Sequence, residues 1–345
     1  MKCSEVKDKI LAVIEEKQLR PGMKIPPFRT LAAELKSCVP TIQRAIAQLV
    51  SEGILTSRVG SGTYVATLAG KNDKMIGILI PHSTGLSPDF ITENLEVIRH
   101  TLMANGYIPI TVSPPSSSTG KERSKAERNL IMQLIEHQVS GIIIDSLAPG
   151  DDDFWGDLEK LSVPVVLFNN CGFAPTRFDC VLSDNYRGGY LAGLRLIEAN
   201  RHNCCFYSTD DGSVVEQERF RGFCVAFGDA GLTQPIVINH NKENFDRACQ
   251  CDGIFCLNDN IAYEVIKGLK TAGIAVPEKI SVMGFDNSLL CTSTEPNMDS
   301  IEQQFRVMGQ RTAELMMRRI ENPNLREQVT VRLDVTLIRR HSVGD

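Results

Sequence analysis

The sequence has no long apolar run, and this absence excludes a membrane protein. Across 345 residues, no apolar stretch approaches the roughly eighteen residues that a membrane-spanning helix requires. The first twenty residues carry charges throughout and lack the uninterrupted apolar core of a secretory signal peptide. We therefore expect a cytoplasmic protein without a membrane partner.

The sequence also lacks the short motifs of common catalytic sites. It has no phosphate-binding loop, no His-Glu zinc pair and no nucleophile elbow, and Gly60-Ser61-Gly62 lacks the further glycine of a dinucleotide loop. No residues for catalysis are visible. The prediction is a protein that is not an enzyme and uses no cofactor.

The eleven cysteines do not follow the spacing of a metal site. Cys204-Cys205 and Cys249-Gln250-Cys251 are close pairs, but each lacks the spaced second pair or the histidines that zinc sites use. An odd number of cysteines without a secretion signal fits a reducing compartment. We interpret them as buried, reduced thiols and predict no bound metal.

The N-terminal region does contain a clear pattern, which is a helix pair followed by a hairpin. A first helix is predicted over 5–18, a short one over 30–35, and a third over 41–52 with apolar residues at helical spacing. Two short strands at 54–56 and 63–65 follow, joined by a turn rich in small residues. This is the outline of a winged helix-turn-helix. In this motif the second helix of the pair, here 41–52, enters the major groove of duplex DNA.

Many residues of this region also match a known family at fixed spacing. The matching positions are Pro21-Gly22, Ile25-Pro26, Arg29, Leu31-Ala32, Thr41-Ile42, Arg44-Ala45-Ile46, Leu49, Glu52-Gly53-Ile54-Leu55, Arg58, Gly60, Gly62-Thr63 and Val65. Their order resembles the DNA-binding domain of GntR-type bacterial transcription regulators over about the first seventy residues. The family usually has Ser-Glu where Pro27-Phe28 stands and Ser-Arg where Cys38-Val39 stands. The second departure removes one expected contact to DNA.

The remaining polar residues are the predicted DNA contacts. Arginine and glutamine can form paired hydrogen bonds with guanine and adenine edges, and a glycine hairpin is slim enough to approach the DNA backbone. The predicted set is Arg29, Thr41, Gln43, Arg44, Arg58, Gly60 and Gly62. Any single arginine of this set could instead be an ordinary charged residue on the solvent-exposed face of a helix that makes no contact with DNA.

The distribution of charge supports DNA binding by this region. Residues 1–70 contain ten Lys or Arg against six Asp or Glu, whereas the remainder contains 27 against 36, and the whole chain has a formal net charge of -5. Basic residues are therefore concentrated where DNA would bind. Because the local excess is modest, two joined copies are needed for useful affinity, and we expect a homodimer.

From residue 75 onwards, short apolar strands alternate with amphipathic helices. The predicted strands are 76–80, 108–112, 141–145, 165–169, 204–207, 235–238, 253–257 and 280–285. The predicted helices are 89–104, 122–137, 154–161, 186–199, 215–230, 243–250 and 260–272. This alternation predicts parallel sheets covered on both faces, and the length favours two lobes, with any ligand in the cleft beyond the carboxyl ends of the strands.

The prediction is thus an α/β protein with an N-terminal winged helix-turn-helix domain and a two-lobed domain of two doubly wound parallel sheets. The boundaries are 1–66 for the first domain, 67–74 for a linker and 75–345 for the second domain. The chain is expected to cross between lobes near 171–180, near Ser300 and near Asn322-Pro323. The first lobe then comprises about 75–173 and 301–322, and the second about 174–300 and 323–342.

The second half carries a family resemblance of its own over roughly 75–342. The matching stretches are 181–185 with Gly188-Gly189, then 218–223, 256–262, 276–287 and Met308-Gly309. They are similar to the effector domain of LacI/GalR-type regulators, whose fold is that of periplasmic sugar-binding proteins. A GntR-type domain joined to a LacI-type domain resembles the AraR-type arabinose repressors.

The resemblance implies effector contacts at Arg219, Asn258 and Asp286. A guanidinium, an amide and a carboxylate suit the hydroxyls of a polyol ring. On the opposite wall we expect Asn169 and the loop that carries His82 and Phe90. Each of these residues also has a structural alternative. Arg219 and Asp286 could form an ion pair with each other, and His82 could be an ordinary loop histidine. Asp184 and Asp259 could cap helices, and Phe90 and Trp155 could be packing residues.

The leading hypothesis is a ligand-responsive transcription regulator, a repressor that binds an operator as a dimer and senses a sugar or sugar-like molecule between its lobes. Two alternatives stay open. One is a carbohydrate-binding protein with a vestigial DNA-binding domain, and the other is a regulator that senses a non-sugar effector such as a nucleobase.

Overall fold

The computed structural model describes residues 3–17, 19, 22–51, 54–58, 62–65, 74–80, 88–115, 120–145, 152–169, 178–209, 213–240 and 244–344. The chain divides into two compact units, Met1–Lys74 and Met75–Asp345. Residues 66–73, which make up most of the predicted linker, lie outside the described residues.

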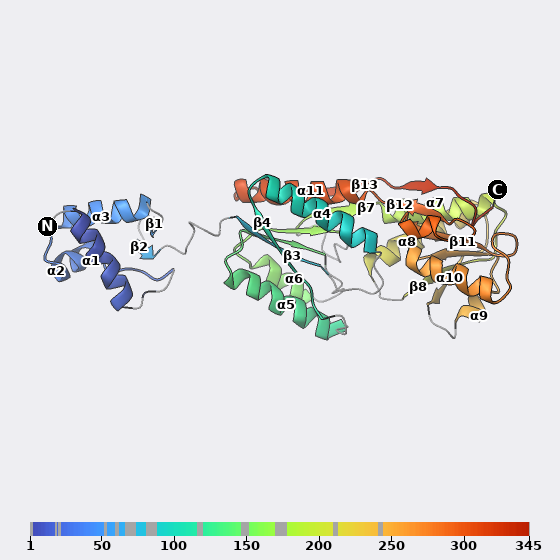
Figure 1. The fold of residues 1–345 in the computed structure, drawn as a ribbon, viewed down its shortest axis with the longest axis horizontal. Coiled ribbons are helices and arrows are strands. Elements are labelled where there is room, and N and C mark those ends of the chain that lie inside the picture. The colour runs from blue at the N-terminus through green and yellow to red at the C-terminus, as the bar shows by residue number, and fades with distance from the viewer. Residues whose placement is uncertain are drawn as a thin grey trace. The chain divides into compact units, whose positions relative to one another are not determined.

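The first unit is a winged helix-turn-helix, as the sequence predicts (Figure 1). Its elements are α1 (Cys3–Glu16), α2 (Phe28–Glu34), α3 (Val39–Ser51), β1 (Leu55–Arg58) and β2 (Gly62–Val65). The strands pair antiparallel with Leu55 opposite Val65. Residues at helical spacing on α1 and α3 form the core, among them Val6, Ile10, Ile42 and Leu49. Each such buried side chain contributes about 1.5–3 kcal/mol to folding.

The first sheet of the second unit contains six parallel strands in the order β13-β7-β6-β5-β3-β4. Its strands are β3 (Met75–Leu79), β4 (Ile108–Val112), β5 (Gly141–Ile144), β6 (Val165–Phe168), β7 (Asp179–Ser183) and β13 (Thr330–Leu333). Successive side chains of a strand point to opposite faces of the sheet, and the central strands are apolar at consecutive positions. Both faces are therefore apolar: Ile142 and Ile144 belong to one core cluster, and Ile143 belongs to the other.

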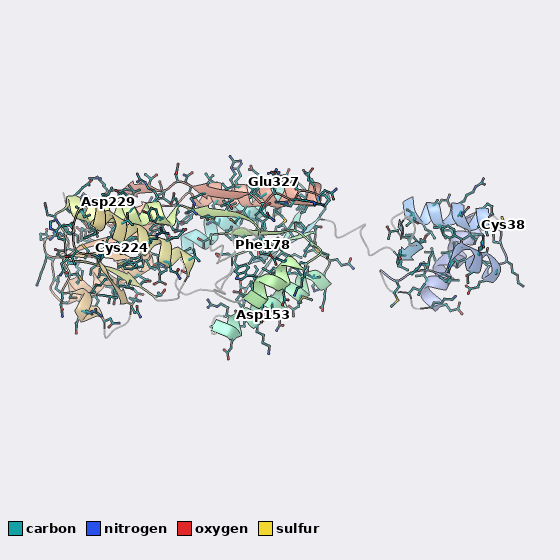
Figure 2. All side chains as sticks on the ribbon, turned by 180° about the vertical axis from the view of Figure 1, so that it is seen from behind. Cys38, Asp153, Phe178, Cys224, Asp229 and Glu327 are labelled. Atoms are coloured by element: carbon teal, nitrogen blue, oxygen red, sulfur yellow. The ribbon has the colours of Figure 1, made fainter. Side chains whose placement is uncertain are left out.

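Helices cover both faces of this sheet (Figure 1). They are α4 (Pro88–Ala104), α5 (Gly120–Glu136), α6 (Asp152–Glu159) and α11 (Phe305–Glu321). Residues of α5 and α6 belong to the core cluster on one face, and residues of α4 and α11 belong to the cluster on the other. Phe178 of this lobe is labelled in Figure 2.

The second sheet has the order β14-β12-β11-β10-β8-β9, with β14 antiparallel to β12 and the other pairs parallel. Its strands are β8 (Cys204–Ser208), β9 (Ile236–Asn239), β10 (Gly253–Cys256), β11 (Ser281–Asp286), β12 (Asp299–Glu302) and β14 (Thr336–Ile338). The helices of this lobe are α7 (Asn185–Glu198), α8 (Val214–Asp229), α9 (Phe245–Ala248), α10 (Asp259–Thr271) and the short η1 (Leu289–Thr292).

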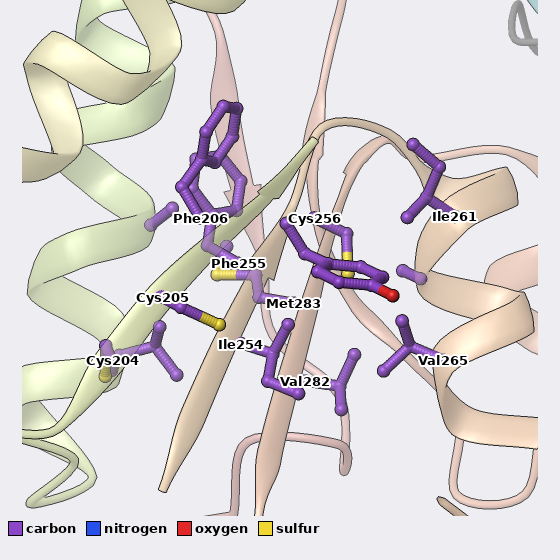
Figure 3. Packing of buried hydrophobic residues seen from close by; sticks show 14 of the residues in the cluster. Cys204, Cys205, Phe206, Ile254, Phe255, Cys256, Ile261, Val265, Val282 and Met283 are labelled. Atoms are coloured by element: carbon purple, nitrogen blue, oxygen red, sulfur yellow. The ribbon is translucent and has the colours of Figure 1, made fainter. Parts of the chain in front are cut away.

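Several cysteines lie in the core of the second lobe beside aromatic rings (Figure 3). Cys204, Cys205 and Cys256 are buried with Phe206 and Phe255, whose ring centroids are 5.2 Å apart. Burial raises the pKa of the Cys256 thiol well above its usual value, which keeps it protonated. The prediction of reduced, buried thiols is confirmed for these residues.

Two of the predicted crossings between lobes are wrong. β7 lies between β6 and β13 in the first sheet, so the chain leaves the first lobe between Ser183 and Asn185 and not near 171–180. β13 also belongs to the first sheet, so the last crossing falls between Leu333 and Thr336 and not at Asn322-Pro323. The third crossing lies between β12 and α11, close to the predicted position near Ser300. The predicted lobe boundaries therefore change for β7 and β13.

Candidate functional site

The first unit exposes polar residues on one face of α3. Gln43 and Arg44 are exposed, whereas Ile42, Ala45 and Ile46 are buried in the core. Arg29 is exposed on α2. A helix that buries one face and exposes side chains of this chemistry on the other can enter a major groove.

Cys38 precedes the first residue of α3 and is exposed (Figure 2). The Cys38 carbonyl accepts hydrogen bonds from the backbone N–H groups of Thr41 and Ile42 at 3.0 and 3.2 Å, so Cys38 caps the helix. Its Sγ lies 2.9 Å from Thr41 Oγ1, and this hydrogen bond lowers the pKa of the Cys38 thiol. Thr41, a predicted DNA contact, is half-buried, and its hydroxyl is hydrogen-bonded to the Cys38 thiol.

The hairpin places Arg58 and Gly62 opposite each other in register. Gly62 has a φ of +123°, a backbone conformation that residues with side chains rarely adopt. Gly60 lies outside the described residues, as does the side chain of Arg58.

In the second unit, Arg219 contacts the residues that precede the other two predicted effector residues. It lies on α8 and is only 4% exposed. Its Nη1 donates to the carbonyl oxygen of Leu257, the residue before Asn258. Its guanidinium carbon lies 3.5 Å from the ring centroid of Phe285, the residue before Asp286, which is a cation–π arrangement. The structure thus brings Arg219 to the carboxyl ends of β10 and β11.

Arg219 is further held by Asn185, which the sequence analysis did not select. Asn185 Oδ1 accepts a hydrogen bond of 2.9 Å from Arg219 Nε, and Asn185 Nδ2 donates to the carbonyl oxygen of Ser183. Asn185 is 3% exposed and starts α7, directly after the chain leaves the first lobe. Its presence in the matched stretch 181–185 was the signal that could have identified it.

Asn258 caps a helix, the role that the sequence suggested for the adjacent Asp259. Its Oδ1 accepts a hydrogen bond of 3.1 Å from the backbone N–H of Ile261 and so caps α10. The capping interpretation holds for Asp184, which accepts from Arg187 N at 2.9 Å, but it is wrong for Asp259.

Asp259 is instead a buried centre of hydrogen bonds beneath the site. Its carboxylate accepts from Ser288 N at 2.7 Å, Ser300 Oγ at 2.7 Å and Cys291 Sγ at 3.2 Å. Desolvation raises the pKa of Asp259. Ser300 in turn accepts from the backbone N–H of Asn287 at 3.0 Å. The network therefore fixes the turn that begins at Asp286.

Asp286 ends β11 and is 7% exposed, with a φ of +120°. Gln303 Nε2 donates to its Oδ1 at 2.7 Å. Gln303 is 6% exposed, and its Oε1 has no hydrogen-bond partner among the described residues. Gln303 follows β12, a strand that the sequence analysis did not predict, so no sequence signal pointed to it.

The first lobe contributes one predicted residue that the structure describes fully. Asn169 follows β6 and donates from Nδ2 to Asp145 Oδ2 at 3.1 Å, and both residues are buried. His82 lies outside the described residues, and for Phe90 only the backbone, within α4, is described. Trp155 packs in the core 5.1 Å from the ring of Phe154, as the packing interpretation predicts.

Other features of the described residues lie away from these groups. A cavity of about 560 Å³ is lined by Lys270, Glu278 and Arg340, among others, and by none of the predicted effector residues. In the described part of the chain, no cluster of His, Cys, Asp and Glu could hold a metal ion. No helix among the described residues is long and apolar enough to cross a membrane.

Comparison with known families matches both parts of the chain. Residues 2–65 match the gntR family of bacterial regulatory proteins, and residues 195–343 match the periplasmic binding protein-like domain. The chain is a transcription regulator that joins a gntR-family DNA-binding domain to a periplasmic binding protein-like domain. The regulator is similar along most of its length to the arabinose metabolism transcriptional repressor of Geobacillus stearothermophilus, with 27% identity over 341 residues, covering 92% of this chain and 90% of that protein.

Two further similarities each cover about four fifths of the chain. The ribose operon repressor of Haemophilus influenzae is 26% identical over 290 residues, covering 80% of the regulator and 83% of the relative. A crystal structure of a LacI family transcriptional regulator from Enterococcus faecalis with bound ribose has a TM-score of 0.66 and 27% identity, and the match covers 79% of the regulator and 99% of that chain. The structural match agrees with the two-lobed fold.

Proposed function

We propose that the regulator is a cytoplasmic, homodimeric repressor whose DNA affinity is set by a sugar bound between the lobes of its second unit. The proposal draws support from relatives named as arabinose and ribose repressors and from a similar structure that contains ribose. Among sugars, a pentose is the effector that these relatives favour. The protein acts by binding and not by catalysis.

The observation that carries the sensor half of the proposal is the position of Arg219. Its guanidinium contacts the residues that precede Asn258 and Asp286, so an arginine, an amide and a carboxylate meet at one edge of the second sheet. Ligands in parallel α/β sheets bind at this edge, beyond the carboxyl ends of the strands.

The chemistry of these groups suits a polyol. Asp286 accepts hydrogen bonds from hydroxyl groups and the guanidinium donates them. Gln303 offers a buried Oε1 that has no partner among the described residues, and a sugar hydroxyl can supply the missing hydrogen bond. Phe285 already holds the guanidinium from one side, which reduces the freedom that Arg219 loses on binding.

A thermal-shift screen tests the sensor half. We expect a pentose such as arabinose or ribose to raise the melting temperature of the full chain and to leave that of an Asp286→Ala variant unchanged. Hexoses, sugar acids and nucleobases complete the screen. A shift by a nucleobase alone would replace the sugar with a different effector class, and an equal sugar shift in Asp286→Ala would contradict the assigned site.

A salt titration tests the DNA half. If α3 enters the groove, Arg44→Ala should weaken binding to duplex DNA and reduce the slope of affinity against salt by about one if Arg44 contacts a phosphate. An exposed lysine of α1, Lys9, supplies the control as Lys9→Ala. A wild-type slope near zero would instead favour a carbohydrate-binding protein whose DNA-binding domain is vestigial.

A further inference from the structure

The segment before α2 pairs with the wing of the first unit through an isolated β-bridge. Lys24 forms an antiparallel bridge with Tyr64 of β2. Around it, Ile25 N donates to the Thr63 carbonyl oxygen and Val65 N donates to that of Met23, both at 2.9 Å. The backbone of Lys24 is therefore fixed beside the hairpin.

The wing has a buried face and an exposed face, and Lys24 lies on the exposed one. Thr63 and Val65 of β2 are buried, as is Ile25. Lys24 and Gly62 are exposed, and along β2 the exposed Gly62 is followed by the buried Thr63 on the opposite face, as in a strand. The outer face of the wing therefore presents a lysine beside a glycine.

The side chain of Lys24 lies across Gly62. A Cβ atom placed on Gly62 would overlap Lys24 Cε and lie 3.1 Å from Lys24 Nζ, so it would displace the end of this flexible side chain. The sequence predicts that Gly62 leaves room for DNA at the hairpin. The structure gives the same glycine a second use, because its missing side chain provides the space in which the Lys24 side chain lies.

Among the described residues of the first unit, no acidic side chain is paired with Lys24, whereas Lys17 is paired with Glu34 at 2.9 Å. Arg58 is the register partner of Gly62, so a second basic residue belongs to the same part of the hairpin. A lysine ammonium is a compact charge that suits a phosphate oxygen.

We propose that Lys24 is a phosphate-contacting residue of the wing and that Gly62 makes the space for its side chain. This inference rests on the DNA-binding role of the first unit. The contact is independent of sequence, so it sets the position of the wing and contributes affinity without choosing bases.

The first experiment measures binding of the full chain to a labelled duplex of random sequence over a range of salt concentrations. For each bound protomer, Lys24→Gln should reduce the salt slope by about 0.9 and lower the affinity about eightfold at about 0.1 M salt. Lys24→Arg should restore the slope, and Lys9→Gln should not change it. A wild-type slope in Lys24→Gln overturns the inference, whereas a flat slope in the wild type overturns DNA binding itself.

The second experiment tests the role of Gly62 with a double-mutant cycle. Gly62→Ala should weaken DNA binding in the wild-type background, and it should cost little more in the Lys24→Gln background. Alanine at the positive φ of position 62 strains the backbone, and this strain should lower the melting temperature equally in the wild-type and Lys24→Gln backgrounds. Melting temperatures therefore measure the strain separately from DNA affinity. An equal loss of DNA affinity in both backgrounds would show that Gly62 acts independently of Lys24 and would overturn this part of the inference.

Discussion

Asp259 is a buried carboxylate that supports the predicted effector residue Asp286 without belonging to the predicted set itself. It is fully buried and accepts hydrogen bonds from a backbone N–H, a hydroxyl and a thiol. Asp259→Ala would leave these donors without an acceptor, and each buried donor left unpaired costs about 1–3 kcal/mol. We expect a loss of about 3 kcal/mol in the free energy of unfolding, measured with urea.

The control for Asp259 is the other aspartate that starts a helix of this lobe. Asp184 caps α7 at a partly exposed position, so Asp184→Ala should cost only about 1 kcal/mol. Equal losses in the two variants would contradict the distinction between a buried network and an exposed cap.

At the scale of single residues, the sequence predicted the effector groups that end predicted strands. Asn258 and Asp286 follow strands rich in apolar residues, and the carboxyl ends of parallel strands meet at one edge. Gln303 and Asp145 were not selected. Gln303 follows a strand whose first residues are the polar Asp299 and Ser300, and the role of Asp145 depends on its contact with Asn169, 24 positions away. Spacing along the chain gives no information about such a contact.

At the scale of elements, the Cys38 thiol directly precedes α3 and so provides a chemical probe of the predicted DNA-binding surface. Among the described cysteines, Cys38 is exposed and the others are buried or partly buried. Its hydrogen bond with Thr41 lowers its pKa and so favours the reactive thiolate. We expect a maleimide to modify Cys38 before the other described cysteines near neutral pH, as measured by peptide mass mapping.

The adduct should also reduce DNA affinity, because it lies where α3 would enter the groove. Cys38→Ser keeps a polar cap and should bind DNA normally before and after treatment with the reagent. DNA binding by the modified wild type at full affinity would place the start of α3 away from the DNA.

The elements that the sequence analysis missed share a physical cause. β7 begins with Asp179, whose carboxylate binds Arg319 of α11 at 2.5 Å, so a charged residue starts a buried strand. β13 is an edge strand with exposed and partly exposed residues. Neither has the continuous apolar run of the central strands. The pairing with Arg319 joins positions 140 residues apart and cannot be deduced from local pattern.

At the scale of the whole molecule, the chain forms two compact units with separate cores. We expect two transitions in calorimetry of the full chain, each with its own ligand dependence. A sugar that binds only the second unit should raise its transition, and duplex DNA should raise that of the first. A single transition shifted by either ligand would show that the units unfold together.

Control of DNA binding by a sugar requires the two ligands to affect each other through the whole molecule. If the sugar changes DNA affinity by some factor, DNA must change sugar affinity by the same factor, because the two routes to the doubly bound state have equal free energy. Couplings of this kind are typically 5–150-fold. We expect duplex DNA to change the affinity for sugar, and sugar to change the affinity for DNA, by equal factors when each ligand is titrated with and without the other. We expect Asp286→Ala to bind DNA as tightly as the wild type without any response to sugar. Sugar binding that leaves DNA affinity unchanged would mean that the sensor half does not control the DNA-binding half, since a ligand with equal affinity for both states shifts neither.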